Sequence, residues 1–308
     1  MSILVVGTVA YDTVETPFGR AERILGGSAT YASLAARVLG AEVGLNAVVG
    51  GDFDEAHVDA LRSHGVGLDG LVRDEDGKTF FWAGRYGHDL STRDTLTTDL
   101  NVLATFEPDL PTSLRAPAIV CLGNLDPTIQ GAVIDQTADA DPLVVADTMN
   151  FWIENTPDAL AETISRVDVL LVNEEEARQL ADTPSLVKAA RDIRAMGPRT
   201  VIIKKGEHGA LLFCDDDVFA APAFLLEDVV DPTGAGDTFL GGFAGHLARA
   251  GSTSPEVMRQ AVVVGGALAS FVVEAFGPER LLATTAPELD RRLDAFQRLA
   301  AVPAVAAV

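Results

Sequence analysis

The sequence predicts an α/β protein with a central, mostly parallel β-sheet, helices on both faces of the sheet and a small β-lid. Short β-branched runs alternate with longer segments of helical character along the 308 residues, which is typical of a parallel sheet buried on both faces. One aromatic and polar segment departs from this alternation. The hydrophobic content of 48% and the charged content of 22% are those of a globular protein with a sizeable core.

Strands and helices are expected in alternation. The expected strands are residues 3–6, 43–49, 118–122, 143–146, 167–172 and 200–204. The expected helices are residues 28–39, 54–63, 128–138, 174–180 and 185–196, followed by 236–250, 255–273 and 287–300. No repeat, low-complexity tract or long polar linker interrupts this order. We therefore expect a single domain over residues 1–308.

Residues 77–103 break the alternation. They contain Phe80, Phe81, Trp82 and Tyr86 without a helical period, followed by a polar stretch. Aromatic and β-branched residues in such a pattern favour extra strands. Together with a companion strand near the N-terminus they would form a lid from about residues 11–25 and 75–104, over the carboxyl ends of the main strands, where open α/β sheets bind ligands. A surface hairpin with no role in binding is the alternative.

The charge of the chain excludes one class of partner and disfavours another. There are 23 basic and 45 acidic residues, which gives a formal net charge of −22. Nucleic acid is excluded because phosphate backbones are held by clusters of Lys and Arg. Anionic membrane surfaces are disfavoured for the same reason, so no membrane partner is expected. Any anionic substrate must be held by donors arranged locally.

The cysteines and histidines predict no zinc site. Cys121 and Cys214 each lie in an apolar stretch, as buried free thiols do in a reducing cytoplasm. The five histidines form no HExxH pattern. The longest apolar run, residues 261–273, is shorter than the roughly 20 residues of a membrane span and predicts a buried helix. The first residues predict a strand rather than a signal peptide, so a cytoplasmic location is expected.

The strongest functional signal is the string Asp-Pro-Thr-Gly-Ala-Gly-Asp-Thr-Phe at residues 231–239. Its small residues let the backbone N–H groups of Gly234, Ala235 and Gly236 point into one concavity, where the dipole of the following helix also attracts an anion. Asp237 could accept a proton from an attacking hydroxyl beside that anion. Phosphoryl transfer needs both features. A glycine-rich turn whose aspartate caps a helix is the alternative.

This string resembles the C-terminal signature of the PfkB/ribokinase family of carbohydrate and nucleoside kinases. A second string, Gly-Gly-Ser-Ala-Thr-Tyr-Ala at residues 26–32, resembles the N-terminal signature of the same family. The two occur in the family's usual order and span nearly the whole chain. The resemblance implies a ribokinase-like fold and an ATP-dependent kinase. It makes Asp237 the catalytic base, the backbone of residues 234–236 the anion hole for the transferred phosphate, and Thr233 one of the ATP-binding residues.

Residues 173–176 read Asn-Glu-Glu-Glu and follow an expected strand. Their spacing is that of a helix-capping box. They also resemble the family's N-x-x-E element, which implies that Asn173 and Glu176 position Mg²⁺ and phosphate, mostly through water. Mg²⁺ prefers oxygen ligands and keeps several waters, so this pair suits it. The resemblance further implies a K⁺ ion near Asp231, Thr233 and the backbone around Gly277.

Residues 204–210 read Lys-Lys-Gly-Glu-His-Gly-Ala. The first of them is the last residue of the expected strand 200–204, and the others follow it. They resemble the family's nucleotide-binding turn, which implies ATP contacts from Lys205, Gly206 and Gly209. The glycines would let the backbone approach the nucleotide, and the lysine would face its phosphates. An ordinary turn with solvated lysines is the alternative.

The resemblance places the acceptor against Asp12, Gly26, Gly27 and Tyr31. A buried carboxylate at Asp12, just past the first strand, would accept hydrogen bonds from two hydroxyls and reject analogues that lack them. The two glycines would bring the backbone close to the same ligand. Many sugar kinases of the family have Asn where this chain has Tyr31. A tyrosine donates one hydrogen bond and brings a large ring, and a core role for Tyr31 is the alternative.

From these observations we expect a kinase that phosphorylates a hydroxyl, a primary one, of a small sugar, with ATP, Mg²⁺ and K⁺. A nucleoside kinase whose lid aromatics stack on the base is the first alternative. Arg85 and Arg93 in the lid leave a sugar-phosphate acceptor open, and a non-catalytic sugar or nucleotide sensor is a further alternative. Relatives of this fold pair through lid strands, and exposed strand edges favour such pairing, so a homodimer is also expected.

Overall fold

The computed structural model describes residues 1–90, 92–215 and 217–301. Its strands are β1 (Ser2–Val6), β2 (Ala10–Thr16), β3 (Gly19–Gly26), β4 (Glu42–Gly50), β5 (Val66–Asp74), β6 (Phe81–Tyr86), β7 (Arg93–Asp99), β8 (Ile119–Leu122), β9 (Leu143–Asp147), β10 (Val169–Asn173), β11 (Thr200–Lys204), β12 (Ala210–Cys214) and β13 (Asp217–Ala221). Its α-helices are α1 (Ser28–Val38), α2 (Glu55–Ser63), α3 (Pro127–Thr137), α4 (Asn150–Asn155), α5 (Pro157–Ile164), α6 (Glu174–Leu180), α7 (Leu186–Arg194), α8 (Ala235–Ala250), α9 (Pro255–Val272), α10 (Glu279–Leu282) and α11 (Ala286–Ala300).

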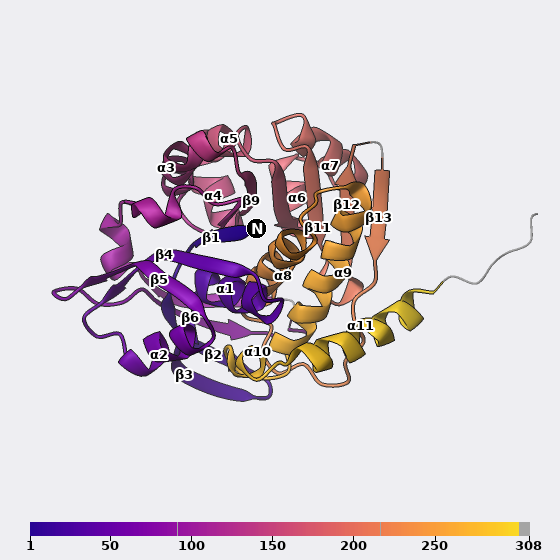
Figure 1. The fold of residues 1–308 in the computed structure, drawn as a ribbon. Coiled ribbons are helices and arrows are strands. Elements are labelled where there is room, and N and C mark those ends of the chain that lie inside the picture. Colours follow the sequence, from indigo (N-terminus) through magenta and orange to yellow (C-terminus); the bar gives the residue numbers. More distant parts are fainter. Residues whose placement is uncertain (91, 216, 302–308) are drawn as a thin grey trace, which may run out of the picture.

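The larger of two sheets has nine strands in the order β13-β12-β11-β10-β9-β8-β1-β4-β5. The strands from β11 to β5 run parallel, whereas β12 and β13 continue the sheet antiparallel. Figure 1 shows helices on both faces of this sheet and the lid strands beside it. Because the carboxyl ends of parallel strands meet at one edge, residues that end β9, β10 and β11 become neighbours there.

Helices can cover both faces of the sheet because both faces of its strands are apolar. In β1, Ile3 and Val5 belong to one core cluster, which also holds residues of α1, α8 and α9. Leu4 and Val6 belong to the other cluster, with residues of α3, α5 and α7. Side chains alternate between the two faces of a strand, so a continuous apolar run fills both cores. The predicted α/β class with helices on both faces is confirmed.

All six expected strands and all eight expected helices are present, with ends shifted by no more than a few residues. The sequence analysis did not predict β5, β12, β13, α4, α5 or α10. Strand β5 lies at the sheet edge and alternates buried with exposed residues, so it lacks the continuous apolar run of its neighbours. The apolar run expected to be a buried helix lies in α9.

The lid is a four-stranded sheet in the order β3-β2-β6-β7. It is built from the two regions that the sequence singled out, although β3 was not expected as a strand. Strand β2 pairs with β6 in parallel and with β3 antiparallel. The inner face of the lid carries Asp12 and Trp82, which are paired in the β2–β6 ladder. The lid therefore places a carboxylate and an indole from two segments that are distant in sequence next to each other.

Cys121 and Cys214 are free and buried, as expected, and burial raises the pKa of the Cys121 thiol to about 12. Within the described ranges, none of the helices combines the length and hydrophobicity needed to cross a bilayer. The assignment of residues 1–308 to a single domain and the cytoplasmic location both stay predictions. Residues 91, 216 and 302–308, which that assignment and the lid range include, lie outside the described residues.

Candidate active site

The predicted anion hole forms the N-terminus of α8. Gly234 is the N-cap, with a left-handed φ of 77° that favours glycine. Its carbonyl accepts the N–H of Thr238 at 2.8 Å, which closes the first helical turn. The first N–H groups of a helix have no partner within the helix. At α8 these groups, with the helix dipole, can therefore hold an anion.

Asp237 lies in the first turn of α8 and is partly exposed. Burial, followed by the nearby Asp147 carboxylate, raises its pKa to about 6, against the lowering effect of Lys204 and of its own N–H. A carboxylate with this pKa is ionised at neutral pH but is a stronger base than an ordinary aspartate. A raised pKa suits a group that accepts a proton, and the role of Asp237 as the base stays a prediction.

Three neighbouring strands end in polar side chains beside this helix. Asp147 ends β9, Asn173 ends β10 and Lys204 ends β11. Nζ of Lys204 donates to Oδ2 of Asp147 at 2.5 Å, and their side chains are only 16% and 7% exposed. A Cβ on Gly236 would lie 3.1 Å from the same Nζ. A buried cation therefore adjoins the first turn of α8.

Sequence reasoning missed the pair Lys204–Asp147 and assigned the phosphate-facing role to Lys205. The signal that could have found it is the shared carboxyl-end edge of β9 and β11, since parallel strands bring their last residues together. Lys205 follows β11, its N–H donates to the carbonyl of Gly209 at 2.8 Å, and its role in ATP binding stays a prediction.

The rest of the predicted nucleotide turn has the backbone that its glycines suggest. Gly206 and Gly209 have left-handed φ values of 53° and 88°. A Cβ on Gly209 would lie 2.0 Å from the carbonyl oxygen of Ala221, so this glycine lets β12 and β13 approach. Around Gly206 there is open space. Of the two, Gly206 therefore leaves more room for a ligand.

Asn173 and Glu176 form a capping box at the start of α6. Oδ1 of Asn173 accepts the N–H of Glu176 at 2.8 Å, and Oε2 of Glu176 accepts the N–H of Asn173 at 2.7 Å. Glu176 is nevertheless buried, and burial followed by the Asp147 carboxylate raises its pKa to about 7. The cap uses one oxygen of this carboxylate, which has a second to offer. The capping interpretation is correct, and the magnesium role stays a prediction.

The predicted acceptor residues lie together near the N-terminus of α8. Asp12 is 5% exposed, and burial, followed by the carboxylates of Asp231 and Asp237, raises its pKa to about 7. The N–H of Gly27 donates to this carboxylate. A Cβ on Gly26 would lie 2.0 Å from Oδ2 of Asp12, so glycine is required for the close approach of β3.

Tyr31 is a core residue, as the alternative interpretation held, and its role in acceptor binding stays a prediction. It is 1% exposed and belongs to the core cluster around α1. Its ring also supports the anion hole, because a Cβ on Gly234 would lie 2.5 Å from ring atoms of Tyr31. Its hydroxyl has no hydrogen-bond partner among the described residues. Burial and then the Asp12 carboxylate raise the pKa of that hydroxyl well above its usual value. It therefore stays a donor near Asp12.

The lid closes onto the glycine-rich string. Oγ1 of Thr233 donates to the hydroxyl of Tyr86 at 3.2 Å. The guanidinium of Arg93 lies over the Trp82 ring, 5.4 Å from its centroid. A Cβ on Gly84 would lie 2.2 Å from the indole, so the ring of Trp82 lies against this glycine. An aromatic face, a cation and a hydroxyl thus line the inner face of the lid.

Asp231, the first residue of the glycine-rich string 231–239, holds that string through hydrogen bonds to its carboxylate. It is 1% exposed, and its oxygens accept the N–H of Thr233 at 2.8 Å and that of Gly277 at 3.3 Å. Burial raises the pKa of this carboxyl despite both hydrogen bonds. A carboxylate whose charge is disfavoured by burial suits a neighbouring cation.

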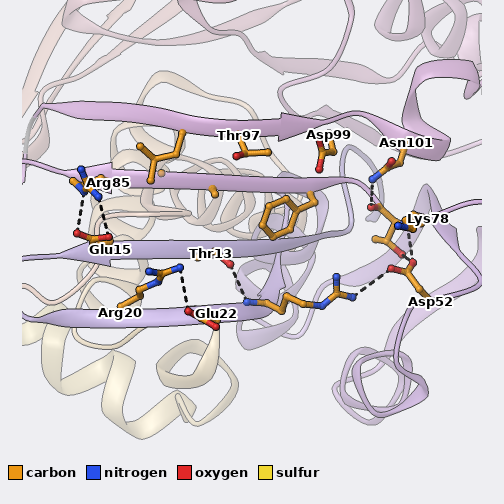
Figure 2. Close-up of a pocket in the computed structure, with 16 residues that line it drawn as sticks. Thr13, Glu15, Arg20, Glu22, Asp52, Lys78, Arg85, Thr97, Asp99 and Asn101 are labelled. Carbon is orange, nitrogen blue, oxygen red and sulfur yellow. Dashed lines mark hydrogen bonds and ion pairs between the residues drawn. The ribbon is translucent and has the colours of Figure 1, made fainter.

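A groove of about 540 Å³ lies on the opposite, outer face of the lid (Figure 2). Side chains that alternate with Asp12 along β2, namely Thr13 and Glu15, line it, so it faces away from the site. Ion pairs such as Arg85–Glu15, at 2.9 Å, cross it. Arg85 therefore does not reach the acceptor, and the homodimer expected through the lid strands stays a prediction.

The raised pKa values predict that the ligand-free protein gains stability on mild acidification. Asp12 and Glu176 have folded-state pKa values of about 7, and Asp237 of about 6. A raised pKa contributes stability that is present at low pH and lost as the pH rises through the folded-state value. The melting temperature should therefore rise between about pH 8 and pH 6. The measurement is a set of thermal melts across this range.

Substitution isolates the contribution of one carboxyl from the general loss of negative charge. Asp237→Asn should raise the melting temperature at about pH 8 and flatten the dependence on pH. Asp139→Asn removes a charge from an exposed position and should change neither. Equal melting curves for the two variants would contradict the raised pKa of Asp237.

The chain is similar to proteins of known activity. A sequence model described as pfkB family carbohydrate kinase matches residues 2–285. The cytidine kinase of Thermococcus kodakarensis is 30% identical over 258 residues, which cover 81% of this chain and 89% of that relative.

Solved structures of kinases have the same fold as this chain. The nucleoside kinase of Methanocaldococcus jannaschii, an archaeal member of the ribokinase family, has a TM-score of 0.77 at 21% identity, with 96% of this chain and 98% of that chain covered. The aminoimidazole riboside kinase of Salmonella enterica, solved with aminoimidazole riboside and an ATP analogue, has a TM-score of 0.75 at 22% identity, with 95% and 100% covered. The fold is that of the ribokinase family.

Proposed function

The chain belongs to the pfkB family of carbohydrate kinases and is a phosphotransferase with an alcohol group as acceptor, and we propose that this acceptor is a nucleoside. The γ-phosphoryl group of ATP is transferred to a primary hydroxyl of the nucleoside sugar. Names of relatives support this choice, since one acts as a cytidine kinase and another is a nucleoside kinase. An aminoimidazole riboside, a nucleoside-like acceptor, occupies a third.

The observation that carries the proposal is the pairing of Asp12 with Trp82 on the inner face of the lid. A carboxylate that is almost fully buried accepts the hydroxyls of a ribose. The indole beside it, with the Arg93 guanidinium 5.4 Å from its ring centroid, offers an aromatic and cationic surface to a base. A free sugar would use the first feature alone, whereas a nucleoside uses both.

Each predicted catalytic residue has a role in this reaction. Asp237 takes the proton of the attacking hydroxyl, and its pKa of about 6 makes it an effective base near neutral pH. The N–H groups of residues 234–236 hold the charge that develops on the transferred phosphoryl group. Tyr86, through its bond with Thr233, holds the lid over the site, which excludes water as a competing acceptor.

The residues present fit Mg²⁺ held through water. The Asp147 carboxylate lies near enough to those of Glu176 and Asp237 to raise the pKa of each, and carboxylates are the hard oxygen ligands that Mg²⁺ prefers. No cluster of metal-ligating side chains that could hold the ion by itself occurs in the described part of the chain. Asn173 and Glu176 would hold its waters, and the ion would neutralise charge on the ATP phosphates.

A monovalent cation such as K⁺ fits beside Asp231. This carboxylate is buried, and burial disfavours its charge. The ion would compensate that charge beneath the anion hole, near Thr233 and the backbone of Gly277.

A sugar acceptor, the first interpretation of the sequence, now ranks second. It shares the base and the anion hole but leaves Trp82 without a ligand. The sensor alternative is dropped, because the chain is a phosphotransferase.

The test is acceptor-dependent release of ADP from Mg·ATP, in K⁺ and in Na⁺ buffers. The acceptors are cytidine, adenosine, inosine, ribose, fructose and a sugar phosphate. We expect the highest kcat/KM with a nucleoside, by about tenfold or more over ribose, because base stacking is worth on the order of 1–3 kcal/mol. Trp82→Ala should reduce that preference and leave activity with ribose unchanged.

A sugar or sugar phosphate that outcompetes every nucleoside would contradict the proposal. Equal rates in K⁺ and Na⁺ would count against the cation beside Asp231 and leave the acceptor assignment intact.

A further inference from the structure

One lysine of the site has no role in the predictions from sequence. Lys204 is at the carboxyl end of β11, and its ammonium group adjoins the first turn of α8. A Cβ on Gly236 would lie 3.1 Å from Nζ of Lys204, and the same Cβ would lie 3.9 Å from Oδ2 of Asp147. Gly236 thus has no side chain where the lysine ends, and the space above it is the anion hole.

The surroundings keep Lys204 charged and fixed. Burial opposes the charge, but the carboxylates of Asp147 and Glu176 outweigh it and raise the pKa of the lysine. Asp147 is itself anchored, because its Oδ1 accepts the N–H of Thr148 at 2.9 Å. Buried ion pairs cost more to desolvate than hydrophobic residues of similar size. A function of the charge is therefore a better reason for the pair than stability.

We propose that Lys204 is a catalytic residue that contacts the transferred phosphoryl group, with Asp147 holding its ammonium group in position. The inference rests on the proposed kinase reaction and deepens it. An ammonium group can donate three hydrogen bonds, and Asp147 receives one of them. The others are available to phosphoryl oxygens held by the α8 amides.

Lys204 supplies charge and moves no proton. The acceptor hydroxyl gives its proton to Asp237 while its oxygen forms a bond to the γ-phosphorus of ATP. The bond from that phosphorus to the β–γ bridging oxygen breaks, and ADP leaves with the electron pair. Negative charge on the transferred oxygens is then balanced by the lysine and the α8 amides.

A lysine outside the site is the matched control. Lys188 has the same charge and the same type of side chain but lies exposed in the first turn of α7, with no ion pair among the described residues. Lys204→Gln should lower kcat by about 10²–10³-fold, as the loss of one charge-stabilising donor does. Lys188→Gln should retain a kcat within a few fold of the wild-type value.

A binding measurement tests the contact without any acceptor. Calorimetry compares a non-hydrolysable ATP analogue with ADP, since the two differ in the γ-phosphoryl group. Lys204→Gln should weaken the analogue by about tenfold or more relative to ADP, as the loss of a charged hydrogen bond does. Lys188→Gln should leave the ratio of the two affinities unchanged.

A double variant separates catalysis from folding. Lys204→Gln leaves a buried Asp147 unpaired and lowers stability for that reason. Lys204→Gln with Asp147→Asn removes both charges and should recover the melting temperature but neither kcat nor the affinity ratio. Recovery of activity in the double variant would show a purely structural pair and overturn the inference.

The inference and the proposed function fail in different ways. If no nucleoside is turned over by the wild-type protein, the acceptor assignment is wrong, while the ratio of analogue to ADP affinity still tests Lys204. An unchanged ratio in Lys204→Gln overturns the contact with the phosphoryl group, whatever the acceptor.

Discussion

Asp237→Asn is expected to lower turnover by about 10²–10⁴-fold, the contribution of a positioned general base. The amide has the same shape as the carboxylate but cannot take the proton of the acceptor hydroxyl. Mg·ATP should bind with nearly wild-type affinity, because the anion hole is made of backbone N–H groups at the start of α8. The measurements are steady-state kcat with the best acceptor and calorimetric binding of an ATP analogue.

Asp139→Asn, at an exposed position in the short 3-10 helix Ala138–Ala140 that follows α3, is the matched control and should leave both quantities unchanged. A variant at position 237 that keeps a near-normal kcat would remove Asp237 as the base. A variant that loses ATP affinity in parallel would indicate a damaged anion hole rather than a missing base.

Gly234→Ala is expected to be nearly as damaging, through the backbone. The residue has a φ of 77°, and a Cβ there would lie 2.5 Å from the ring of Tyr31. That ring is buried in the core of α1 and cannot move aside. The clash shifts the first turn of α8, and displacement of catalytic groups by about 1 Å can cost 10²-fold in rate. We expect this loss in kcat together with a lower melting temperature.

The same helix provides the control for backbone strain alone. Gly251, the C-cap of α8, has a φ of 65°, and a Cβ there would meet nothing within 4 Å. Gly251→Ala should therefore cost only the left-handed conformation, about 1–2 kcal/mol, with kcat unchanged. If Gly234→Ala and Gly251→Ala gave equal kcat values, the contact between Gly234 and Tyr31 would not matter for catalysis.

The strands and helices that could be predicted are those whose own residues form a clear local pattern. Strands β1, β8 and β10 are continuous apolar runs, and α8 and α9 follow strings with clear N-terminal signals. Strand β3 could not be predicted, because four of its eight residues are exposed and three are charged. Its position in the lid depends on its antiparallel pairing with β2. The residue pattern of the β3 segment alone does not indicate that pairing.

The site divides in the same way. Asp237 and the glycines before it could be predicted, since their chemistry lies in one string. The pairs Lys204–Asp147 and Asp12–Trp82 could not, because each joins strands that are distant in sequence. Parallel strands bring such residues together only once the strand order is known.

The measurement that tests the account most directly is product identification in a single turnover. The enzyme, in excess over γ-labelled Mg·ATP, is mixed with a nucleoside, and the labelled product is identified by mass. We predict a nucleoside 5′-monophosphate with the wild-type protein and none on the same timescale with Asp237→Asn. Label recovered only as inorganic phosphate, or transferred equally by the Asp237→Asn variant, would contradict nucleoside phosphorylation with Asp237 as its base.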